Sequence, residues 1–448
     1  MRFPRPGDSV RTLRRRAAAV CVAALLTSAI SSGTGLAARV DHTRAITPGP
    51  VVAWGNGTLG QLGDGRTSSS PVPVRTSRIR QVIDLDGGAG HTVSLRADGT
   101  VWTWGLNDRG QLGNGTTRST DRPVRVCAPG QSAPCSRPLT DVVAVSAGAS
   151  HTLALRSDGT VVAWGDNEYG QLGDATSTDR STPVQVCAPG QTAPCSSFLT
   201  GITNLDAGYW HNLAVQIGGT LHSWGLNSSG QLGDGSNVFN STTPVQAALT
   251  GAPGNVAAGR YHSLAHMTDS TVRSWGFNGF GQLGDGTTTS TNLPVQVCAQ
   301  GQTAPCAAFL TGVNEVAAGA DYSLALPTDG TIRGWGDNGF GQLGDGTTTH
   351  RNTPVQTCAE GQTAPCGAFL TGVIGFAAGG YHTLALQSDL TLKGWGYNLS
   401  GQIGDGTTAN RSTPVQVCAV RQTAPCSQPL SGVIAVAAGG DHSLATHH

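Results

Sequence analysis

The chain has 448 residues, of which 12% are charged and 64 are glycine. That is too little charge for a disordered acidic or basic tail and too much glycine for a helical protein. The 27 basic and 27 acidic residues balance, so no net field attracts nucleic acid or anionic lipid, and generic DNA binding is excluded.

Residues 1–38 have the layout of a secretory signal peptide. Six arginines, ending with Arg16, precede the apolar run Ala17–Leu26, and Leu36-Ala37-Ala38 supplies a small-residue cleavage site. A membrane anchor is disfavoured because the run falls short of the ~20 residues that a span needs. A twin-arginine signal at 14–16 and a lipid-modified Cys21 are weaker alternatives. We therefore predict a secreted protein with no span after signal removal, a short linker over 39–50, and possible attachment to the cell surface.

Two landmarks repeat seven times over residues 51–448. Trp-Gly recurs at steps of 50, 60, 60, 51, 60 and 60 residues, and Ala-Gly followed by an aromatic ring keeps the same phase. The tryptophans are Trp54, Trp104, Trp164, Trp224, Trp275, Trp335 and Trp395, and the ring residues are His91, His151, His211, His262, Tyr322, His382 and His442. A period of this length indicates a repeat architecture.

Each unit contains four short, alternating, β-rich segments. In one unit these are 142–147, 151–155, 160–164 and 183–186, and Asp158-Gly159 between the second and third favours a type I′ hairpin turn. Seven such units predict an all-β, seven-bladed β-propeller of four-stranded antiparallel blades. The chain starts with a third strand at 51–54 and stops after a second strand at 442–445. We therefore expect these two segments to pair and close the ring, which disfavours a linear solenoid.

The repeated motif resembles the regulator of chromosome condensation repeat family. It reads Ala-Gly-x-x-His-Ser/Thr-Leu-Ala-Leu, then Asp-Gly-Thr, then Trp-Gly-x-Asn-x-x-Gly-Gln-Leu-Gly-Asp-Gly-Thr-Thr, and it covers essentially all of 51–448. The resemblance implies a seven-bladed propeller. It also implies, as one alternative function, guanine-nucleotide exchange on a small GTPase.

Ten cysteines lie in five copies of a nine-residue frame such as "CAPGQTAPC". The frame falls in insertions of ten residues that two of the seven units lack. In a secreted chain such pairs indicate five local disulfides, and zinc or a catalytic dithiol is disfavoured by the spacing and the repetition. The expected pairs are Cys127 with Cys135, Cys187 with Cys195, Cys298 with Cys306, Cys358 with Cys366, and Cys418 with Cys426.

No catalytic constellation stands apart from the repeat, so we expect a non-enzymatic protein with no cofactor and no metal. The ring of histidines is better explained by each side chain bonding its own turn than by a metal site or proton relay. Strand parity places the Gly-x-x-His turns and the Trp-Gly-x-Asn loops on one side of the disc. The opposite side should carry the Asp-Gly hairpins and the cysteine loops.

The positions that vary between units on the first side are rich in aromatic residues, the ingredients of a protein-binding hot spot. The candidate partner-binding residues are Tyr169, Tyr209, Trp210, Arg260, Tyr261, Phe277, Phe280, Phe340, Tyr381 and Tyr397. We therefore predict a monomeric scaffold that binds a protein through this side. Related secreted propellers, the type II β-lactamase inhibitor proteins, resemble the repeat in their "HSLAL" and "AWG" strands and make an inhibitor-like role conceivable. Carbohydrate or cell-wall binding by the aromatic side is the remaining alternative.

Overall fold

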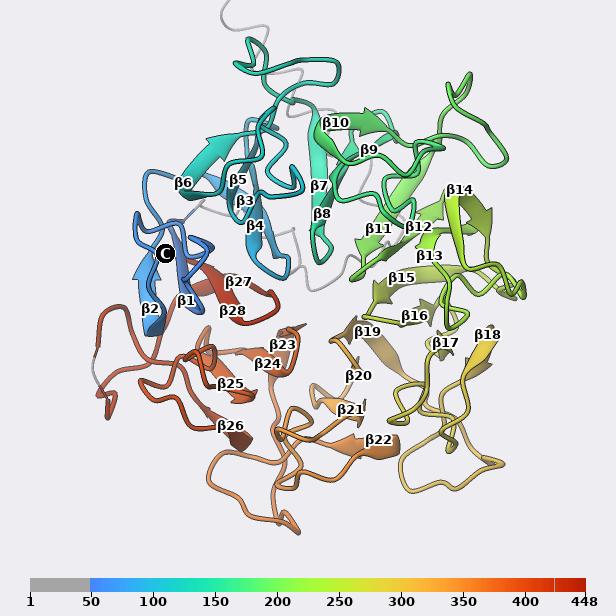
Figure 1. The fold of residues 1–448 in the computed structure, drawn as a ribbon. Helices are drawn as coiled ribbons and strands as arrows, with labels where there is room; N and C mark the ends of the chain where they lie inside the picture. The colour runs from blue at the N-terminus through green and yellow to red at the C-terminus, as the bar shows by residue number, and fades with distance from the viewer. Residues whose placement is uncertain (1–48, 423) are drawn as a thin grey trace, which may run out of the picture. The chain divides into compact units, whose positions relative to one another are not determined.

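The computed structural model describes residues 49–422 and 424–448. In this part of the chain, 28 strands form seven four-stranded antiparallel sheets that are arranged radially as a propeller (Figure 1). The predicted all-β, seven-bladed fold is therefore confirmed. The predicted signal peptide and most of the linker fall within residues 1–48, outside the described residues.

The blades are numbered here in chain order, with the innermost strand first. Blade 1 contains β3 (Val82–Gly87), β4 (His91–Arg96), β5 (Val101–Gly105) and β6 (Thr120–Arg125), and blade 2 contains β7 (Val142–Ala147), β8 (His151–Arg156), β9 (Val161–Gly165) and β10 (Arg180–Gln185). Blade 3 contains β11 (Ile202–Ala207), β12 (His211–Gln216), β13 (Leu221–Leu226) and β14 (Asn240–Gln246), and blade 4 contains β15 (Pro253–Ala258), β16 (His262–Met267), β17 (Val272–Gly276) and β18 (Thr291–Gln296). Blade 5 contains β19 (Val313–Ala318), β20 (Tyr322–Pro327), β21 (Arg333–Gly336) and β22 (Arg351–Gln356), and blade 6 contains β23 (Val373–Ala378), β24 (His382–Gln387), β25 (Leu392–Gly396) and β26 (Arg411–Gln416). Blade 7 is completed by both ends of the described chain: β27 (Val433–Ala438), β28 (His442–His447), β1 (Val51–Gly55) and β2 (Ser70–Arg75).

The ring closes through β1 and β28, as the sequence predicts. Val51 is paired with Thr446, Ala53 with Leu444, and Gly55 with His442 in an antiparallel register without a bulge. All five β1 residues are buried. Closure removes the exposed sheet edges that an open array would leave at its two ends.

The hairpin between the second and third strands differs from the predicted type I′ turn. Only Gly159 has a positive φ, of 79°, and its N–H donates to the backbone oxygen of Arg156 at 2.9 Å. Asp158 accepts hydrogen bonds from the backbone N–H and the hydroxyl of Thr160, at 3.0 and 2.6 Å. The turn is thus a type I turn followed by a left-handed glycine, because the aspartate side chain supports a conformation with negative φ.

Apolar side chains fill the spaces between neighbouring blades. Trp224 of blade 3 is fully buried and packs with Leu153, Leu155 and Leu172 of blade 2. Its indole N–H donates to the backbone oxygen of Gln171 at 3.0 Å, and the other six Trp-Gly tryptophans bond the preceding blade in the same way. The close approach requires glycine at position 173, where an added Cβ would lie 2.9 Å from the indole nitrogen of Trp224.

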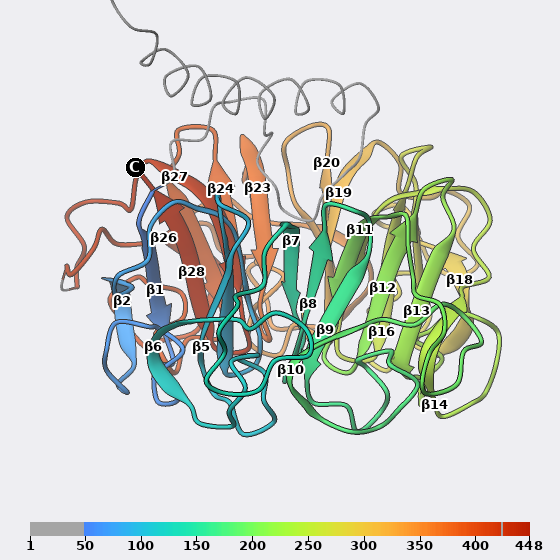
Figure 2. The same cartoon turned by 90° about the horizontal axis from the view of Figure 1, so that it is seen from above.

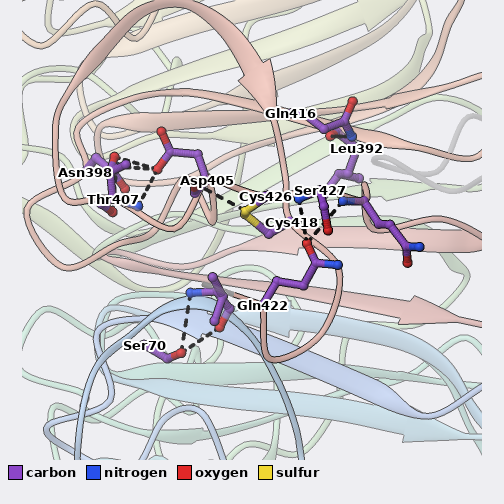
Figure 3. Close-up of a disulfide and its surroundings, with 12 residues drawn as sticks. Ser70, Leu392, Asn398, Asp405, Thr407, Gln416, Cys418, Gln422, Cys426 and Ser427 are labelled. Atoms are coloured by element: carbon purple, nitrogen blue, oxygen red, sulfur yellow. Dashed lines mark hydrogen bonds between the residues drawn. A yellow bond between two sulfur atoms is a disulfide. The ribbon is translucent and has the colours of Figure 1, made fainter. Parts of the chain in front are cut away.

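All five predicted disulfides are present in the structure, each between cysteines eight residues apart. In the Cys418–Cys426 loop, the amide oxygen of Gln422 accepts the backbone N–H of Ser427 at 3.1 Å (Figure 3). Gln191, Gln302 and Gln362 accept equivalent bonds in their own loops. The glutamine that recurs in the nine-residue frame therefore stabilises the loop that the disulfide closes.

The disulfide loops lie further out than strand parity predicts. The connections that contain them end beside the Asp-Gly hairpins, since the N–H of Ile202 donates to the oxygen of Gly159 at 3.0 Å. Between these ends, however, the loops project from the outer rim of the disc (Figure 1). They rest there on the long loop of the same blade: an added Cβ at Gly115 would lie 2.8 Å from the backbone nitrogen of Ala133.

Candidate functional site

Antiparallel pairing places the Gly-x-x-His turns and the Trp-Gly-x-Asn loops at the same end of every blade, which we call the loop face (Figure 2). Seven turns form its inner rim. The N–H of Ala149 donates to the backbone oxygen of Tyr209, and the N–H of Tyr209 donates to that of Gly259. The circle is closed by the N–H of Gly440, which donates to the backbone oxygen of Gly88 at 3.0 Å. Side chains carried by these turns are therefore held on a rigid frame.

Six histidines link each blade to the next, which corrects the prediction that each bonds its own turn. His211 Nε2 lies 2.8 Å from the hydroxyl of Ser263, one blade further on. That hydroxyl donates to the backbone oxygen of Gln231 at 2.8 Å, so it must accept from the histidine, whose proton is on Nε2. The corresponding pairs are His91 with Thr152, His151 with Asn212, His262 with Ser323, His382 with Ser443, and His442 with Thr92.

Tyr322 occupies the seventh position of this ring. Its hydroxyl donates to the backbone oxygen of His382 in the next blade at 2.5 Å. Burial lowers the pKa of His211 to about 3 and that of His151 to about 4. These side chains are therefore neutral structural donors at physiological pH and do not form a proton relay.

The Trp-Gly-x-Asn loops are held by their own polar side chains. Asn167 accepts the N–H of Leu172 at 2.9 Å and donates to the backbone oxygens of Thr176 and Thr178 at 3.1 Å. The amide oxygen of Gln171 accepts the N–H of Tyr169 at 2.8 Å. Gln282 and Gln342 hold Phe280 and Phe340 in the same manner. In three of the loops, a repeated glutamine thus fixes the backbone of an aromatic residue.

Most of the predicted aromatic residues form one continuous cluster. Rings of blades 2, 3 and 4 contact in the order Tyr169, Trp210, Tyr261, Phe277 and Phe280, with centroid separations between 5.2 and 6.5 Å. Tyr209 packs on the edge of Trp210 at 5.6 Å. We call these six residues the first aromatic cluster. Tyr169, Trp210 and Tyr261 remain half-buried and Phe280 is exposed, so the cluster presents rings to solvent.

The remaining aromatic candidates form a second cluster in blades 5 and 6. Phe340 lies 5.5 Å from the ring of Tyr381 and 4.8 Å from that of Tyr397. Arg260 connects the two clusters: its guanidinium carbon is 5.3 Å from the ring of Tyr209 and 5.5 Å from that of Tyr381. It also bonds the Tyr381 hydroxyl and pairs with Asp321 at 3.2 Å. All ten candidates are therefore brought to one face, although Arg260 is already occupied by internal partners.

Two residues that contact the first cluster were missed in the sequence analysis. Phe239, which is 60% exposed, packs against Tyr169 at 6.0 Å. His350 packs against Phe280 at 5.1 Å, and its Nδ1 accepts the backbone N–H of Asn338 at 3.1 Å. Both residues lie directly before the fourth strand of their blade, at the end of the loop that joins the third strand to the fourth. These loops fold back toward the aromatic rings. Phe239 could have been found from the sequence, because "NVFN" places a large apolar pair in a polar loop.

Carboxylates surround the aromatic residues. Burial raises the pKa of Asp166, and the neighbouring Asp179 raises it further. Burial also raises the pKa of Asp441. The pKa of the Tyr397 phenol is raised by burial and, to a smaller extent, by Asp441. The loop face therefore combines half-exposed rings with acidic groups that are incompletely solvated.

The centre of the disc holds a cavity of about 180 Å³ lined by the innermost strands. On one wall the Ser146 hydroxyl lies 3.1 Å from a carboxylate oxygen of Asp86 and 3.1 Å from one of Asp206. Burial raises the pKa of Asp86 to about 6 and that of Asp206 to about 7. Tyr209 reaches the far side of this channel, since an added Cβ at Gly380 would lie 3.2 Å from its hydroxyl.

Across residues 49–422 and 424–448, no group of three or more His, Cys, Asp or Glu side chains is placed to hold a metal ion. The same residues contain no helix that is long and apolar enough to cross a membrane.

These features define a seven-bladed propeller with a repeated internal polar network and a variable aromatic face. The family model described as the RCC1-like domain matches residues 50–446, and the chain belongs to this family. The Arabidopsis thaliana ultraviolet-B receptor UVR8 is 32% identical over 358 residues, which are 69% of this chain and 75% of that protein. The Homo sapiens E3 ubiquitin-protein ligase HERC2 is 29% identical over 89% of this chain, but the match spans only 8% of HERC2.

Solved structures of relatives share the fold. Human WBSCR16 superposes with a TM-score of 0.70 at 23% identity, covering 89% of this chain and 98% of that one. Prp20p from Saccharomyces cerevisiae, a structure reported with its binding to Gsp1p and histones, superposes with a TM-score of 0.69 at 22% identity over 90% and 92% of the two chains. At this level of identity the likeness establishes the propeller architecture alone.

Proposed function

We propose that the protein is a secreted, non-enzymatic scaffold that binds a protein partner through the loop face. The observation that carries the proposal is the first aromatic cluster, whose contacting rings stay half-exposed on a backbone fixed by Asn167, Gln171 and the rim hydrogen bonds. Rigid, partly exposed aromatic residues bind at a low entropy cost and dominate the energy of protein interfaces.

Secretion is supported by two independent features. The five disulfides in rim loops suit an oxidising compartment. The signal-peptide pattern in residues 1–38 leads to the same compartment. For this reason we do not propose nucleotide exchange on a small GTPase for this chain.

The test is affinity capture from culture fluid with the tagged secreted chain, comparing wild type with Trp210→Ala and Tyr261→Ala. Each variant should bind the captured partner with a dissociation constant at least ~30-fold higher, the loss expected for a hot-spot residue worth about 2 kcal/mol. Each should also shift the melting temperature by only a few degrees, because the two rings are half-exposed. Trp164→Ala, which empties a fully buried site, should instead cost about 3–5 kcal/mol of stability.

Two outcomes would contradict the proposal. In one, both variants capture the partner as well as wild type does. In the other, wild type captures no protein but binds a glycan array, which would identify the face as a carbohydrate site.

A further inference from the structure

We propose that the first aromatic cluster binds an arginine side chain of the protein partner, stacked beside Tyr169 and Trp210 and paired with Asp166 and Glu168. The inference rests on the proposed function, since it names the chemistry of the group that the loop face recognises. Its experiment separates the failure of this inference from the failure of that function.

Charge is unbalanced beside the aromatic rings. The loop contains four carboxylates, and Asp174 is paired with Arg180. The other three, those of Asp166, Glu168 and Asp179, have the guanidinium of Arg109 close to them. Arg109 is engaged with Asp179 at 3.2 Å. Asp166 is 7% exposed and accepts the backbone N–H of Glu168 at 3.2 Å. The three carboxylates therefore outnumber the guanidinium by two, which leaves the loop with a net negative charge.

These carboxylates lie next to the aromatic rings. Tyr169 follows Glu168 directly, and burial raises the pKa of its phenol, with further contributions from Glu168 and Asp166. Tyr169 in turn contacts Trp210, whose ring is 5.2 Å from that of Tyr261. A cation placed against these rings would meet both the negative faces of the aromatic systems and the carboxylates.

The same face already contains an arginine that is held by aromatic rings and a carboxylate. Arg260 lies over Tyr209 and Tyr381 and pairs with Asp321, which is 4% exposed. Its planar guanidinium stacks on rings and bonds a carboxylate at once, which a lysine ammonium does less well. The surroundings of Tyr169 and Trp210 have the rings and the carboxylates of this arrangement, but the guanidinium near them, that of Arg109, is paired with Asp179.

The experiment measures binding of acetylated, amidated Gly-Gly-Arg-Gly-Gly to the full secreted chain by saturation-transfer NMR, with lysine and citrulline peptides for comparison. The arginine peptide should bind, the lysine peptide at least ~3-fold more weakly, and the citrulline peptide not detectably. Asp166→Asn combined with Glu168→Gln should weaken arginine binding at least ~5-fold. Glu360→Gln, which removes a carboxylate from an exposed rim loop, is the matched control and should leave it unchanged.

Equal binding of the arginine and citrulline peptides, no binding of the arginine peptide at millimolar concentration, or no effect of the double variant would each overturn the inference. The captured partner distinguishes the two proposals. If Trp210→Ala abolishes capture of the partner while the Asp166→Asn/Glu168→Gln variant captures it fully, the loop face binds a partner but does not recognise an arginine side chain. If both variants capture it normally, both proposals fail.

Discussion

The side chain of His211 shows how one residue holds two blades together. Its ring is buried, its Nε2 bonds Ser263 of the next blade, and an added Cβ at Gly208 would lie 2.9 Å from its Cε1 atom. Glycine is thus required three residues before the histidine, both by the ring and by the next blade, since the added Cβ would lie 2.5 Å from the backbone oxygen of Gly259. This contact was not evident from sequence, because it joins residues 52 positions apart that only the assembled propeller brings together.

The buried histidines predict that acid destabilises the protein. Burial lowers the folded-state pKa of six of them to about 3 or 4, below the unfolded value of about 6.5. Their contribution to stability is therefore complete above pH 6.5 and is lost as the pH falls toward 4, by about 1.4 kcal/mol per pH unit for each histidine. Urea unfolding at pH 7.5, 6.0 and 5.0 should show falling stability.

Asp86 and Asp206 make the free energy of unfolding depend on pH in the opposite direction. Burial raises the folded-state pKa of Asp86 to about 6 and that of Asp206 to about 7, so their contribution is complete at low pH and is lost as the pH rises through these values. Six histidines outweigh two aspartates between pH 6 and 4. His211→Gln should show a shallower dependence of stability on pH than wild type, and a stability that stays constant or rises between pH 6.5 and 5 would contradict the assignment.

At the scale of the element, the strands of one blade can be predicted from the local alternation of residue types in the sequence. The segment 142–147 forms β7 with the predicted bounds, since its alternating β-branched and small residues suit a packed inner strand. The predicted fourth strand at 183–186 is instead β10 (Arg180–Gln185), because one carboxylate oxygen of Asp174 accepts both Nε and Nη2 of Arg180, at 3.0 and 2.8 Å, and so holds the start of the strand. The positions of the aromatic residues could be predicted, but their contacts could not, since these depend on how the long loops fold back.

The disulfide loops are predicted to stabilise single blades without being required for the fold. Blades 3 and 7 have no cysteine pair in the connections that follow β14 and β2. Replacing both Cys187 and Cys195 with serine should therefore lower the free energy of unfolding by at most ~2.5 kcal/mol, the chain-entropy estimate for a loop of this size. The measurement is urea unfolding, with Ser157→Ala on the hairpin side as a control; loss of folding would show that the bridge is essential.

At the scale of the whole molecule, β1 closes the ring so that blade 7 contacts both of its neighbours. Trp54 of β1 donates to the backbone oxygen of Gln402, and His442 of β28 bonds Thr92 of blade 1. Blade 7 therefore uses the same contacts with both neighbours as every other blade. The two ends of the described residues, at 51–55 and 442–447, are held by the contacts of the repeat. The complementary half-units could be recognised from sequence because each carries its own part of the repeat.

Hydrogen exchange should reveal this closure. The amides of Val51–Gly55 are predicted to exchange as slowly as those of β12, because both strands are buried and paired on two sides. Ala53→Pro, which removes a backbone donor inside β1, should accelerate exchange across blade 7. Rapid exchange of residues 51–55 in the wild-type protein would show that the ring is open.

The loop face is tested most directly by the exchange footprint of the captured partner on the complete protein. We expect slower exchange in the loops that carry Tyr169, Trp210, Tyr261 and Phe280, with no change in the rim loop Cys187–Cys195 or in the hairpin at Asp158-Gly159. Protection confined to the rim loops or to the hairpins, with the aromatic loops unchanged, would contradict it.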